Sequence, residues 1–556
     1  MSAYAKWLSP KLSLTTLVFL TALFLATVDN QAFLTAIFKV VDTSGLGSSH
    51  FKVAVFIALI ALFSLLLSFF ASKYVFKPIV ILILILAAII SFFMDSYGVI
   101  VDVSMIQNIV ETDSKEATEL LSAHLVRHVV LVGLLPALCL YRIDIQYSSF
   151  FKELGTRLIV MILISTVLGS IVFTYYKDFA LIDRNNRALR YFINPNYPIY
   201  ALGKYIKRSL NPEVITITAI GKDAQQINTW KTRGKKSIVV VVVGETARAQ
   251  NFSLNGYAQN TNPLLSQEAI INFPDTHSCG TATAESVPCM FSDFGRSDYS
   301  DSKAKHYENV LDVLTHAGIN VLWRDNNSGC KGVCDRVTTE SMEKLTVPEI
   351  CNDKGCFDEI LLQGLQEQID KFSNDGVIVL HQKGSHGPAY YQRYPETFKK
   401  FMPECASNQV QDCPQQQIIN AYDNSILYTD YFLTYLIHIL QKNTDRYNTA
   451  LLYMSDHGES LGEKGIYLHG LPYKFAPDEQ IHIPYKFAPD EQIHIPFIMW
   501  LSPEFATSFN IDTDCLAQHS GEEYSHDNLF HSLLGMLDVQ TGKYDAELDI
   551  FNRCRR

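Results

Sequence analysis

The string VVVVVGET, residues 239–246, decides the fold of the C-terminal part of the chain. A run of valines that ends at a glycine is typical of a strand buried on both faces, as in a parallel sheet. Gly244 and Glu245 close the run, so a carboxylate stands where the strand ends. Because ligands bind beyond the carboxyl ends of such strands, the string predicts a parallel sheet with a ligand site at Glu245.

From Lys236 onward, apolar strings of strand length alternate with helical stretches. This alternation indicates an α/β domain with a largely parallel sheet. The predicted strands are Ile238–Val243, Ile319–Trp323, Val377–Leu380, Thr449–Met454 and Phe497–Trp500, and the predicted helices lie near Asn309–Ala317 and Gln416–Leu440.

The N-terminal part contains apolar runs that approach the roughly 20 residues needed to cross a bilayer as a helix. The five runs are about Leu12–Val28, Val53–Phe70, Ile79–Met94, His124–Leu140 and Leu158–Phe173. The basic residues around them gather on one side, which indicates the cytoplasm: Lys6, Lys11, Lys73, Lys77, Arg142, Lys152 and Arg157. We interpret the first run as a retained helix and not a secretory signal, because four more spans follow it. An odd number of spans then places the C-terminal part outside the cytoplasm.

We therefore expect a transmembrane domain over residues 1–175, an interfacial linker over 176–235 and an external α/β domain over 236–556. The linker mixes tyrosines with basic side chains, which suits the headgroup layer of a membrane, although an ordinary solvated linker is the alternative. The net charge of -11 and the absence of a basic patch with interleaved aromatic residues argue against nucleic acid as a partner.

Cysteines are concentrated in the external part, and only Cys139 of the eleven falls in an apolar run. Close pairs in a compartment that allows oxidation predict disulfides, with a zinc-ribbon or redox site as the alternative. The pairs are Cys279 with Cys289, Cys330 with Cys334, Cys351 with Cys356, and Cys405 with Cys413, whereas the pairing of Cys515 and Cys554 stays open.

A second strand end with potential ligand residues lies in the string LLYMSDHGES, residues 451–460, where Asp456 and His457 follow the predicted strand. Glu, Asp and His side chains are ligands suited to Zn²⁺, and two segments that end at one sheet edge can converge on one ion. A capping role for each polar group is the alternative. Together with Glu245, the residues favour a zinc site.

Two further histidines lie in glycine-containing turns, His386 in HQKGSHGPAY and His469 in YLHGLP. Imidazole can ligate a metal when neutral or donate to a phosphate when charged, so both are candidates for a second metal position or a phosphate site. Ordinary surface histidines are the alternative, and His381, His482 and His494 are weaker candidates.

A hydroxyl nucleophile is predicted in SCGTATAESVPC, residues 278–289, a loop of small residues between two cysteines. A threonine hydroxyl is almost never ionised at neutral pH, and a nearby metal ion would make it reactive. Thr281, Thr283 and Ser286 are all candidates, and a polar surface loop is the alternative.

Six strings in this order resemble the motifs of the lipid A phosphoethanolamine transferases, including the mobile colistin-resistance enzymes, over nearly the whole chain. They are GETAR, SCGTATAESVPCMFS, DNNSGCKGVC, HQKGSHGPAYY, MSDHGES and YLHGLPY. The resemblance implies an inner-membrane protein with an alkaline-phosphatase/sulfatase-like catalytic domain in the periplasm. It further implies zinc held by Glu245, Asp456, His457 and the nucleophile Thr283.

The activity that this resemblance implies is transfer of phosphoethanolamine from phosphatidylethanolamine to a lipid A phosphate through a phosphothreonine, which gives polymyxin and colistin resistance. His386 and His469 would act near the substrate phosphate and a second zinc, and Ser328 and Lys331 would contact the phosphoethanolamine group. Three more residues would help to bind the donor: Asn108, Thr112 and Glu116.

Two features depart from the family pattern. Glu285 puts a carboxylate beside the nucleophile, where it would oppose an alkoxide or attract the ethanolamine ammonium. The twelve residues Tyr473–Pro484 recur without change as Tyr485–Pro496, between His469 and the strand expected at Phe497. Loop entropy alone makes such an insertion cheap, whereas displacement of His469 would be costly.

Two other functions remain alternatives. One is a related transferase or hydrolase that acts on another cell-envelope glycan, such as a sulfatase, a phosphodiesterase or a polyglycerol-phosphate transferase, because these share the zinc and hydroxyl chemistry. The other is a zinc-binding membrane sensor without turnover, which would form no covalent intermediate.

Overall fold

The computed structural model describes residues 10–43, 49–111, 118–210, 216–345, 347–352, 354–471 and 488–555. Lys6, Thr112, Glu116, His482 and the first repeat copy, Tyr473–Pro484, lie outside the described residues. The described chain forms two compact units, the first within residues 10–106 and 121–208 and the second within 107–120, 209–471 and 488–555.

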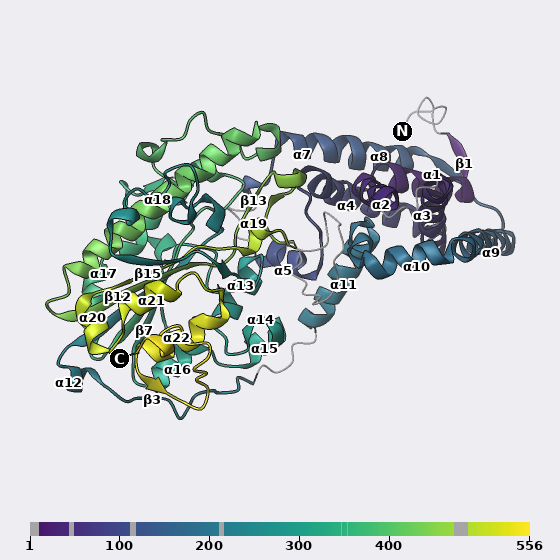
Figure 1. The fold of residues 1–556 in the computed structure, drawn as a ribbon. Helices are drawn as coiled ribbons and strands as arrows, with labels where there is room; N and C mark the ends of the chain where they lie inside the picture. Colours follow the sequence, from purple (N-terminus) through teal and green to yellow (C-terminus); the bar gives the residue numbers. More distant parts are fainter. Residues whose placement is uncertain are drawn as a thin grey trace. The chain divides into compact units, whose positions relative to one another are not determined.

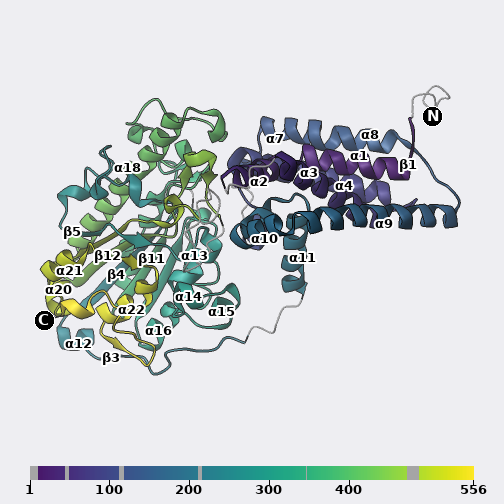
Figure 2. The same cartoon turned by 45° about the vertical axis from the view of Figure 1, so that its right-hand side comes forward.

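The first unit consists mainly of helices (Figures 1 and 2). Four segments are long and apolar enough to cross a membrane, and a bent pair of helices can provide a fifth span. The four are α3 (Ser49–Phe69), α4 (Phe76–Tyr97), the segment Ala123–Arg142 and α9 (Phe150–Thr174). The segment Ala123–Arg142 comprises α7 (Ala123–His128), the π-helix η2 (Val129–Leu134) and α8 (Leu135–Arg142).

The first predicted run, Leu12–Val28, forms α1 (Leu14–Thr27), which is too short to cross a membrane alone. Helix α2 (Gln31–Thr43) follows at an angle of 64°, and the bent pair together is long enough. At the break, Asn30 Nδ2 donates to the carbonyls of Leu25 at 2.8 Å and Asn194 at 2.6 Å. Because these bonds satisfy backbone groups inside an apolar unit, they stabilise the bend.

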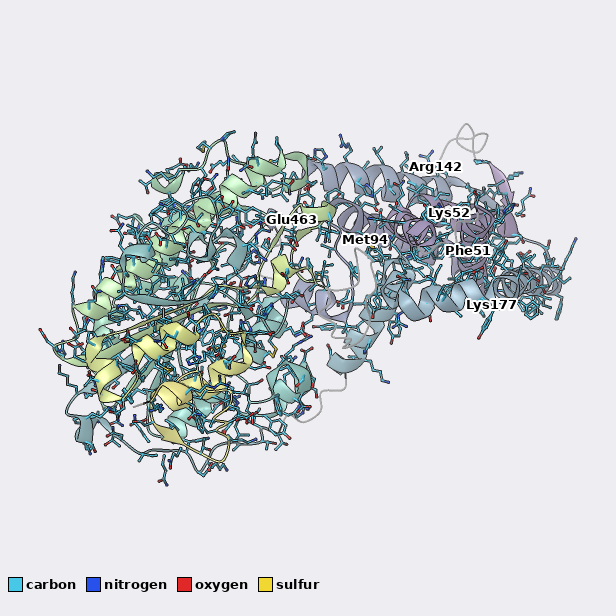
Figure 3. All side chains as sticks on the ribbon, in the orientation of Figure 1. Phe51, Lys52, Met94, Arg142, Lys177 and Glu463 are labelled. Atoms are coloured by element: carbon cyan, nitrogen blue, oxygen red, sulfur yellow. A yellow bond between two sulfur atoms is a disulfide. The ribbon has the colours of Figure 1, made fainter. Side chains whose placement is uncertain are left out.

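The helices of the first unit pack closely on one another. Helix α3 lies against α1 and α9, and α4 lies against η2 and α8. A Cβ atom added at Gly133 in η2 would lie 3.1 Å from Ala88 Cβ, so this glycine allows close approach to α4. At the start of α3, the ring of Phe51 lies 5.4 Å from that of Tyr175 and 5.1 Å from that of Phe179 (Figure 3).

Residues 176–210, expected as part of a linker, are largely helical. They form α10 (Tyr176–Asn185), the 3₁₀-helix η3 (Arg187–Phe192) and α11 (Asn196–Leu210). The rings of Tyr191 and Tyr197 lie 4.5 Å apart between the last two of these helices. The expected place of this region at the membrane interface, and the domain boundaries at 175 and 235, stay predictions.

A seven-stranded sheet forms the centre of the second unit, in the order β5, β15, β12, β4, β11, β7, β8. The strands from β12 to β8 run parallel, and β15 pairs antiparallel with both β12 and β5. Their bounds are β5 (Ile270–Phe273), β15 (Phe497–Leu501), β12 (Tyr447–Ser455), β4 (Lys236–Gly244), β11 (Gly376–His381), β7 (Asn320–Asp325) and β8 (Thr338–Ser341). The predicted strands and the largely parallel sheet are confirmed.

Helices cover both faces of this sheet (Figures 1 and 2). Side chains of Val239, Val241 and Val243 join one core with residues of α13 (Thr283–Met290), α16 (Val310–His316) and α22 (Asp527–Met536). The long helix α18 (Gln415–Gln441) lies on the other face. Burial on both faces explains why β4 consists almost entirely of valine.

Five disulfides clamp loops of the second unit: Cys279–Cys289, Cys330–Cys334, Cys351–Cys356, Cys405–Cys413 and Cys515–Cys554. The last joins two cysteines whose partners the sequence left open. A disulfide sulfur is not a thiolate, so these cysteines do not form the alternative zinc-ribbon site. Cys139 in α8 is the free cysteine of the described chain.

Asp430 in α18 gives the second unit a pH-dependent stability. Its carboxylate accepts the backbone N–H groups of Leu264 at 3.0 Å and Leu265 at 2.9 Å, and burial raises its pKa to about 7. Since the folded state favours the protonated carboxyl, this contribution to stability is present below about pH 4 and is lost as the pH rises through about 7. We expect Asp430→Asn to remove a change in the free energy of unfolding on the order of 3–4 kcal/mol between these pH values. The check is the melting temperature of both proteins in detergent at a series of pH values. The same dependence of melting temperature on pH in the parent and the variant would contradict the prediction.

Candidate active site

Polar residues converge where the parallel strands end. Glu245 follows β4, and Asp456 and His457 follow the neighbouring strand β12. Their ligand atoms all lie within 4.8 Å of one another, and all three residues are buried. His457 Nε2 lies 3.4 Å from Glu245 Oε1 and 3.4 Å from Asp456 Oδ2. The two strand ends that the sequence singled out thus form one cluster.

Thr283 brings a hydroxyl to this cluster as the first residue of α13. Its Oγ1 donates to Glu245 Oε2 at 3.1 Å and lies 3.4 Å from His457 Nε2. The other two candidate hydroxyls have different partners, because Thr281 Oγ1 donates to the Leu471 carbonyl at 2.6 Å and Ser286 Oγ donates to the Asp456 carbonyl. Of the three, Thr283 is the one whose hydroxyl contacts the side chains of the cluster.

The cluster fits a divalent cation. His457 Nδ1 donates to the Gly458 carbonyl at 2.9 Å, and burial lowers the pKa of His457 to about 4, so its Nε2 presents a lone pair. Asp456 Oδ1 accepts the backbone N–H groups of Thr246 and His457, whereas no donor among the described residues reaches the buried Oδ2. Two buried carboxylates beside a neutral imidazole require a positive charge between them. Oxygen and nitrogen ligands of this kind suit zinc.

A second layer of residues holds these groups. Asn327, just after β7, donates from Nδ2 to Glu245 Oε2 at 2.6 Å and to the Gln382 carbonyl at 2.9 Å. His381 Nδ1 lies 2.9 Å from Asp325 Oδ2, and its Nε2 lies 3.3 Å from Asn327 Nδ2, so His381 supports Asn327. Sequence reasoning missed Asn327, although it stands at a strand end in the string DNNSG.

His386 and His469 lie together beside the cluster. Their ring centroids are 5.3 Å apart, and the centroid of His469 is 4.5 Å from that of His457. His469 Nδ1 lies 2.7 Å from Glu459 Oε2, and the hydroxyl of Tyr390 donates to the other oxygen of this carboxylate. Burial lowers the pKa of His469, but the charge and hydrogen bond of Glu459 outweigh it, so the pKa is raised. Sequence reasoning missed Glu459, two residues after His457.

Comparisons with known proteins agree with this geometry. The family model described as Sulfatase matches residues 237–485, and the model described as Phosphoethanolamine transferase EptA/EptB matches residues 59–210. Phosphoethanolamine transferase EptA of Escherichia coli strain K12 is 38% identical over 552 residues, which cover 98% of each chain. The chain belongs to the phosphoethanolamine transferase family.

Two further relatives support the assignment to the phosphoethanolamine transferase family. Phosphatidylethanolamine transferase Mcr-1 of Escherichia coli is 40% identical over 490 residues, which cover 85% of this chain and 89% of that protein. The solved structure of the integral membrane protein lipooligosaccharide phosphoethanolamine transferase A from Neisseria meningitidis matches with a TM-score of 0.91 and 37% identity, covering 98% of this chain and 100% of that chain.

Membership of this family confirms several expectations. The chain is an enzyme with an apolar helical membrane part and an alkaline-phosphatase/sulfatase-like domain. It is an inner-membrane protein whose catalytic domain lies in the periplasm. The resemblance stated from the six motifs is therefore confirmed.

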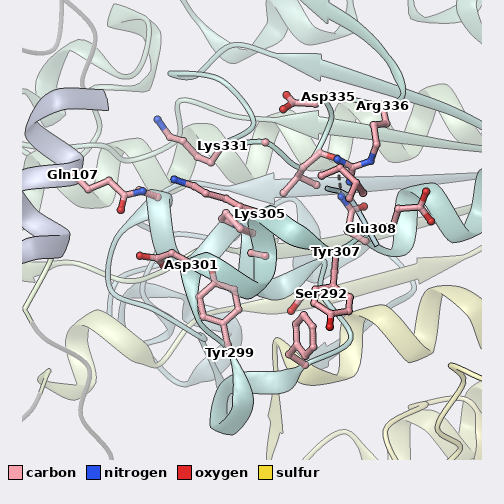
Figure 4. A pocket seen from close by; sticks show the side chains of 18 of the residues that line it. Gln107, Ser292, Tyr299, Asp301, Lys305, Tyr307, Glu308, Lys331, Asp335 and Arg336 are labelled. Carbon is pink, nitrogen blue, oxygen red and sulfur yellow. Dashed lines mark hydrogen bonds between the residues drawn. The ribbon is translucent and has the colours of Figure 1, made fainter. Parts of the chain in front are cut away.

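Two residues expected to contact the phosphoethanolamine group of the donor line a cavity. Lys331 Nζ donates to Ser328 Oγ at 2.9 Å, and both residues line a cavity of about 560 Å³ (Figure 4). Of the three expected donor-binding residues in the external loop, Asn108 lies in α5 (Val103–Glu111), whereas Thr112 and Glu116 lie outside the described residues.

His386 is tied to the end of that external loop. Arg393 Nε donates to the His386 carbonyl at 2.6 Å, and the guanidinium pairs with both carboxylate oxygens of Glu119 at 3.2 and 2.5 Å. Asn408 Nδ2 also donates to the Glu119 carbonyl at 3.0 Å. Since Arg393 and Glu119 are both buried, this bidentate pair fixes residue 119 on the catalytic domain.

Glu285, the carboxylate expected to depart from the family pattern beside Thr283, pairs with Arg296. The distance between Arg296 Nη1 and Glu285 Oε1 is 2.6 Å. The guanidinium offsets the negative charge that would otherwise oppose an alkoxide on Thr283. The carboxylate next to Thr283 is therefore charge-compensated within the same unit.

The second repeat copy has a structural role next to the site. Gln492 Nε2 donates to Ser460 Oγ and to the Leu468 carbonyl, both at 3.0 Å, and its Oε1 accepts the N–H of Leu471 at 3.2 Å. These bonds hold the turn that carries His469. His494, in the same copy, lies 2.6 Å from the Pro274 carbonyl through its Nε2 and takes no part in the cluster.

Removal of one repeat copy is expected to preserve activity. Deleting Tyr473–Pro484 or Tyr485–Pro496 gives the same polypeptide, because the copies are identical. The remaining copy still contains the glutamine that makes the Gln492 contacts. The shorter connection can join Leu471 to Ala488, because Leu471 and Pro489 both hydrogen-bond to Gln492 and the two chain ends to be joined are therefore close. We expect unchanged expression and equal or higher transfer activity. Loss of transfer in a well-folded deletion protein would contradict this.

Proposed function

We propose that the chain is a zinc-dependent enzyme that transfers phosphoethanolamine from phosphatidylethanolamine to a phosphate of lipid A through a covalent phosphothreonine on Thr283. The observation that supports this most directly is the hydroxyl of Thr283 between Glu245 and His457, beside Asp456 Oδ2, which accepts no hydrogen bond from the described residues. A hydroxyl in such a position is a nucleophile that needs a cation.

Glu245, Thr283, Asp456 and His457 are the residues that would hold zinc. When bound there, zinc would act as a Lewis acid that lowers the pKa of the hydroxyl and offsets charge on the phosphate oxygens. In the first displacement, Thr283 Oγ1 forms a bond to phosphorus as its proton passes to Glu245, which accepts from it at 3.1 Å. The bond between phosphorus and the diacylglycerol oxygen breaks.

The departing diacylglycerol oxygen needs a proton. His469 is the donor we propose, because Glu459 raises its pKa and holds its Nδ1 at 2.7 Å. His386 lies beside it and would donate a hydrogen bond to the phosphate. A second zinc held by these two histidines is the alternative to this role, because imidazole ligates a metal only when it is neutral.

In the second displacement, a phosphate oxygen of lipid A attacks phosphorus on the phosphothreonine. The bond from phosphorus to Thr283 breaks, and Thr283 recovers its proton from Glu245. The attacking phosphate gives its proton to His469, which replaces the one passed to diacylglycerol in the first displacement. Ser328 and Lys331 would contact the phosphoethanolamine group, and the donor would also contact three loop residues, Asn108, Thr112 and Glu116.

Lipid A as the acceptor is supported by the name of the Neisseria meningitidis relative, a lipooligosaccharide phosphoethanolamine transferase. Each transferred group brings an ammonium to an anionic phosphate. Polymyxins and colistin are cationic, so the modified surface attracts them less, and resistance follows.

The proposal is tested by incubating the purified chain with labelled phosphatidylethanolamine and lipid A. We expect labelled lipid A, formed only when zinc is present. Release of free ethanolamine phosphate without lipid A product would favour the hydrolase alternative. Zinc binding with neither product would favour a sensor without turnover.

A further inference from the structure

A cavity of about 560 Å³ lies beside α13, and two of its lining residues directly follow active-site residues in the chain. Ala284 follows the nucleophile Thr283, and Ser328 follows Asn327, which donates to Glu245. We call it the α13 cavity and define it by six of its lining residues: Ala284, Pro288, Phe294, Lys305, Ser328 and Lys331. The cavity is therefore lined by the chain neighbours of Thr283 and Asn327.

Two ammonium groups stand at one end of the α13 cavity. Lys305 comes from α15 (Asp301–His306) and Lys331 from the disulfide-clamped turn after β7. Figure 4 shows both side chains ending on the side of the cavity where Gln107 lies. Lys331 Nζ donates to the carbonyl and hydroxyl oxygens of Ser328, and among the described residues no ion pair joins Lys305 or Lys331 to a carboxylate. This end is suited to a phosphate.

The rest of the wall has a different chemistry. Aromatic rings of Phe294, Tyr299 and Tyr307 line it, together with four charged side chains: Asp301, Glu308, Asp335 and Arg336, of which Arg336 pairs with Asp312. Sugars bind to walls of this kind, because carboxylates accept from their hydroxyl groups and aromatic faces cover their apolar faces. A phosphoethanolamine group is much smaller than a ligand that fills a pocket of this size.

We propose that the α13 cavity is the acceptor subsite and binds a phosphorylated sugar, with its phosphate between Lys305 and Lys331. This inference rests on the proposed function and extends it, because it assigns Lys305 to acceptor recognition and gives Lys331 a contact to the acceptor phosphate besides its contact to the phosphoethanolamine group. Lys305 would set the affinity for the acceptor without touching Thr283.

The test separates the two half-reactions. The chain is first loaded with phosphatidylethanolamine, the rate of adduct formation is recorded, and discharge is then followed against the concentration of lipid A. We expect Lys305→Met to raise the half-saturating acceptor concentration about ten-fold or more and to leave adduct formation unchanged, because it removes one charged contact to phosphate. Lys305→Arg should restore most of the affinity. Lys371→Met, which removes an exposed lysine of α17 (Leu365–Lys371), is the matched control and should change neither step.

A binding measurement without turnover adds a second readout. Glucosamine 1-phosphate is titrated into the zinc-loaded full chain, with inorganic phosphate and phosphoethanolamine as comparison probes. We expect the sugar phosphate to bind most tightly and Lys305→Met to weaken it by a similar factor. Slower adduct formation in Lys305→Met, or tighter binding of phosphoethanolamine, would overturn the inference and assign the cavity to the donor. No adduct in the unaltered chain would overturn the proposed function itself.

Discussion

Thr283→Ala is expected to abolish phosphoethanolamine transfer, with a loss on the order of 10³-fold or more in the rate with phosphatidylethanolamine and lipid A. The physical reason is the position of its hydroxyl, which lies 3.1 Å from Glu245 Oε2 and 3.4 Å from His457 Nε2. Alanine leaves the cluster without a nucleophile, and water in its place would give hydrolysis and no transfer. The measurement is the initial rate of labelled lipid A formation.

Thr281→Ala is the matched control, because it removes a hydroxyl from the same disulfide-clamped loop. Its Oγ1 donates to the Leu471 carbonyl at 2.6 Å and does not contact the cluster. We expect this variant to lose some stability, about 1 kcal/mol for one buried hydrogen bond, and to keep transfer. Equal losses in both variants would show that the loop, and not the Thr283 hydroxyl, is what transfer requires.

Removal of the metal is expected to have the second largest effect. Chelation should stop transfer and lower the melting temperature of the full chain in detergent, since a cation at a thousand-fold excess over its dissociation constant stabilises a fold by about 4 kcal/mol. Asp456→Asn should lose transfer and lose the melting shift. Because the buried Asp456 Oδ2 has no hydrogen-bond donor among the described residues, the metal-free variant should be at least as stable as the metal-free parent.

Asp423→Asn is the control for this prediction. Asp423 is also a buried aspartate, but both of its oxygens have donors, Asn251 Nδ2 at 2.6 Å and the Tyr257 hydroxyl at 2.9 Å. We expect it to keep the metal-dependent melting shift whatever it does to overall stability. Full activity of Asp456→Asn in the presence of a chelator would contradict the assignment of the metal ligands.

Five of the seven strands could be predicted from the sequence because each is a compact apolar run bounded by polar or glycine residues. Strand β8 has the polar sequence TTES and was not predicted, and β5 was also missed. The same reasoning brought Glu245 and Asp456 together, since β4 and β12 are adjacent and parallel. Their convergence follows from a rule about strand ends and needs no knowledge of long-range packing.

Other parts of the site depend on contacts between segments far apart in the chain. Thr281 could not be distinguished from Thr283 by residue type, because the carbonyl that accepts from Thr281 belongs to a residue 190 positions later. The bend after α1 depends on Asn194, 164 positions from Asn30. Arg393 and Glu119 are 274 positions apart. No local pattern encodes such pairs.

The covalent intermediate on Thr283 is the central claim, and intact-protein mass spectrometry tests it most directly. The unaltered chain and Thr283→Ala are each loaded with zinc and incubated with phosphatidylethanolamine in the absence of lipid A. We predict a phosphoethanolamine adduct on the unaltered chain alone, located by peptide mapping to the peptide that contains Thr283, and discharged when lipid A is added. An adduct that persists in Thr283→Ala, or transfer to lipid A by a folded chain that never carries an adduct, would contradict the account.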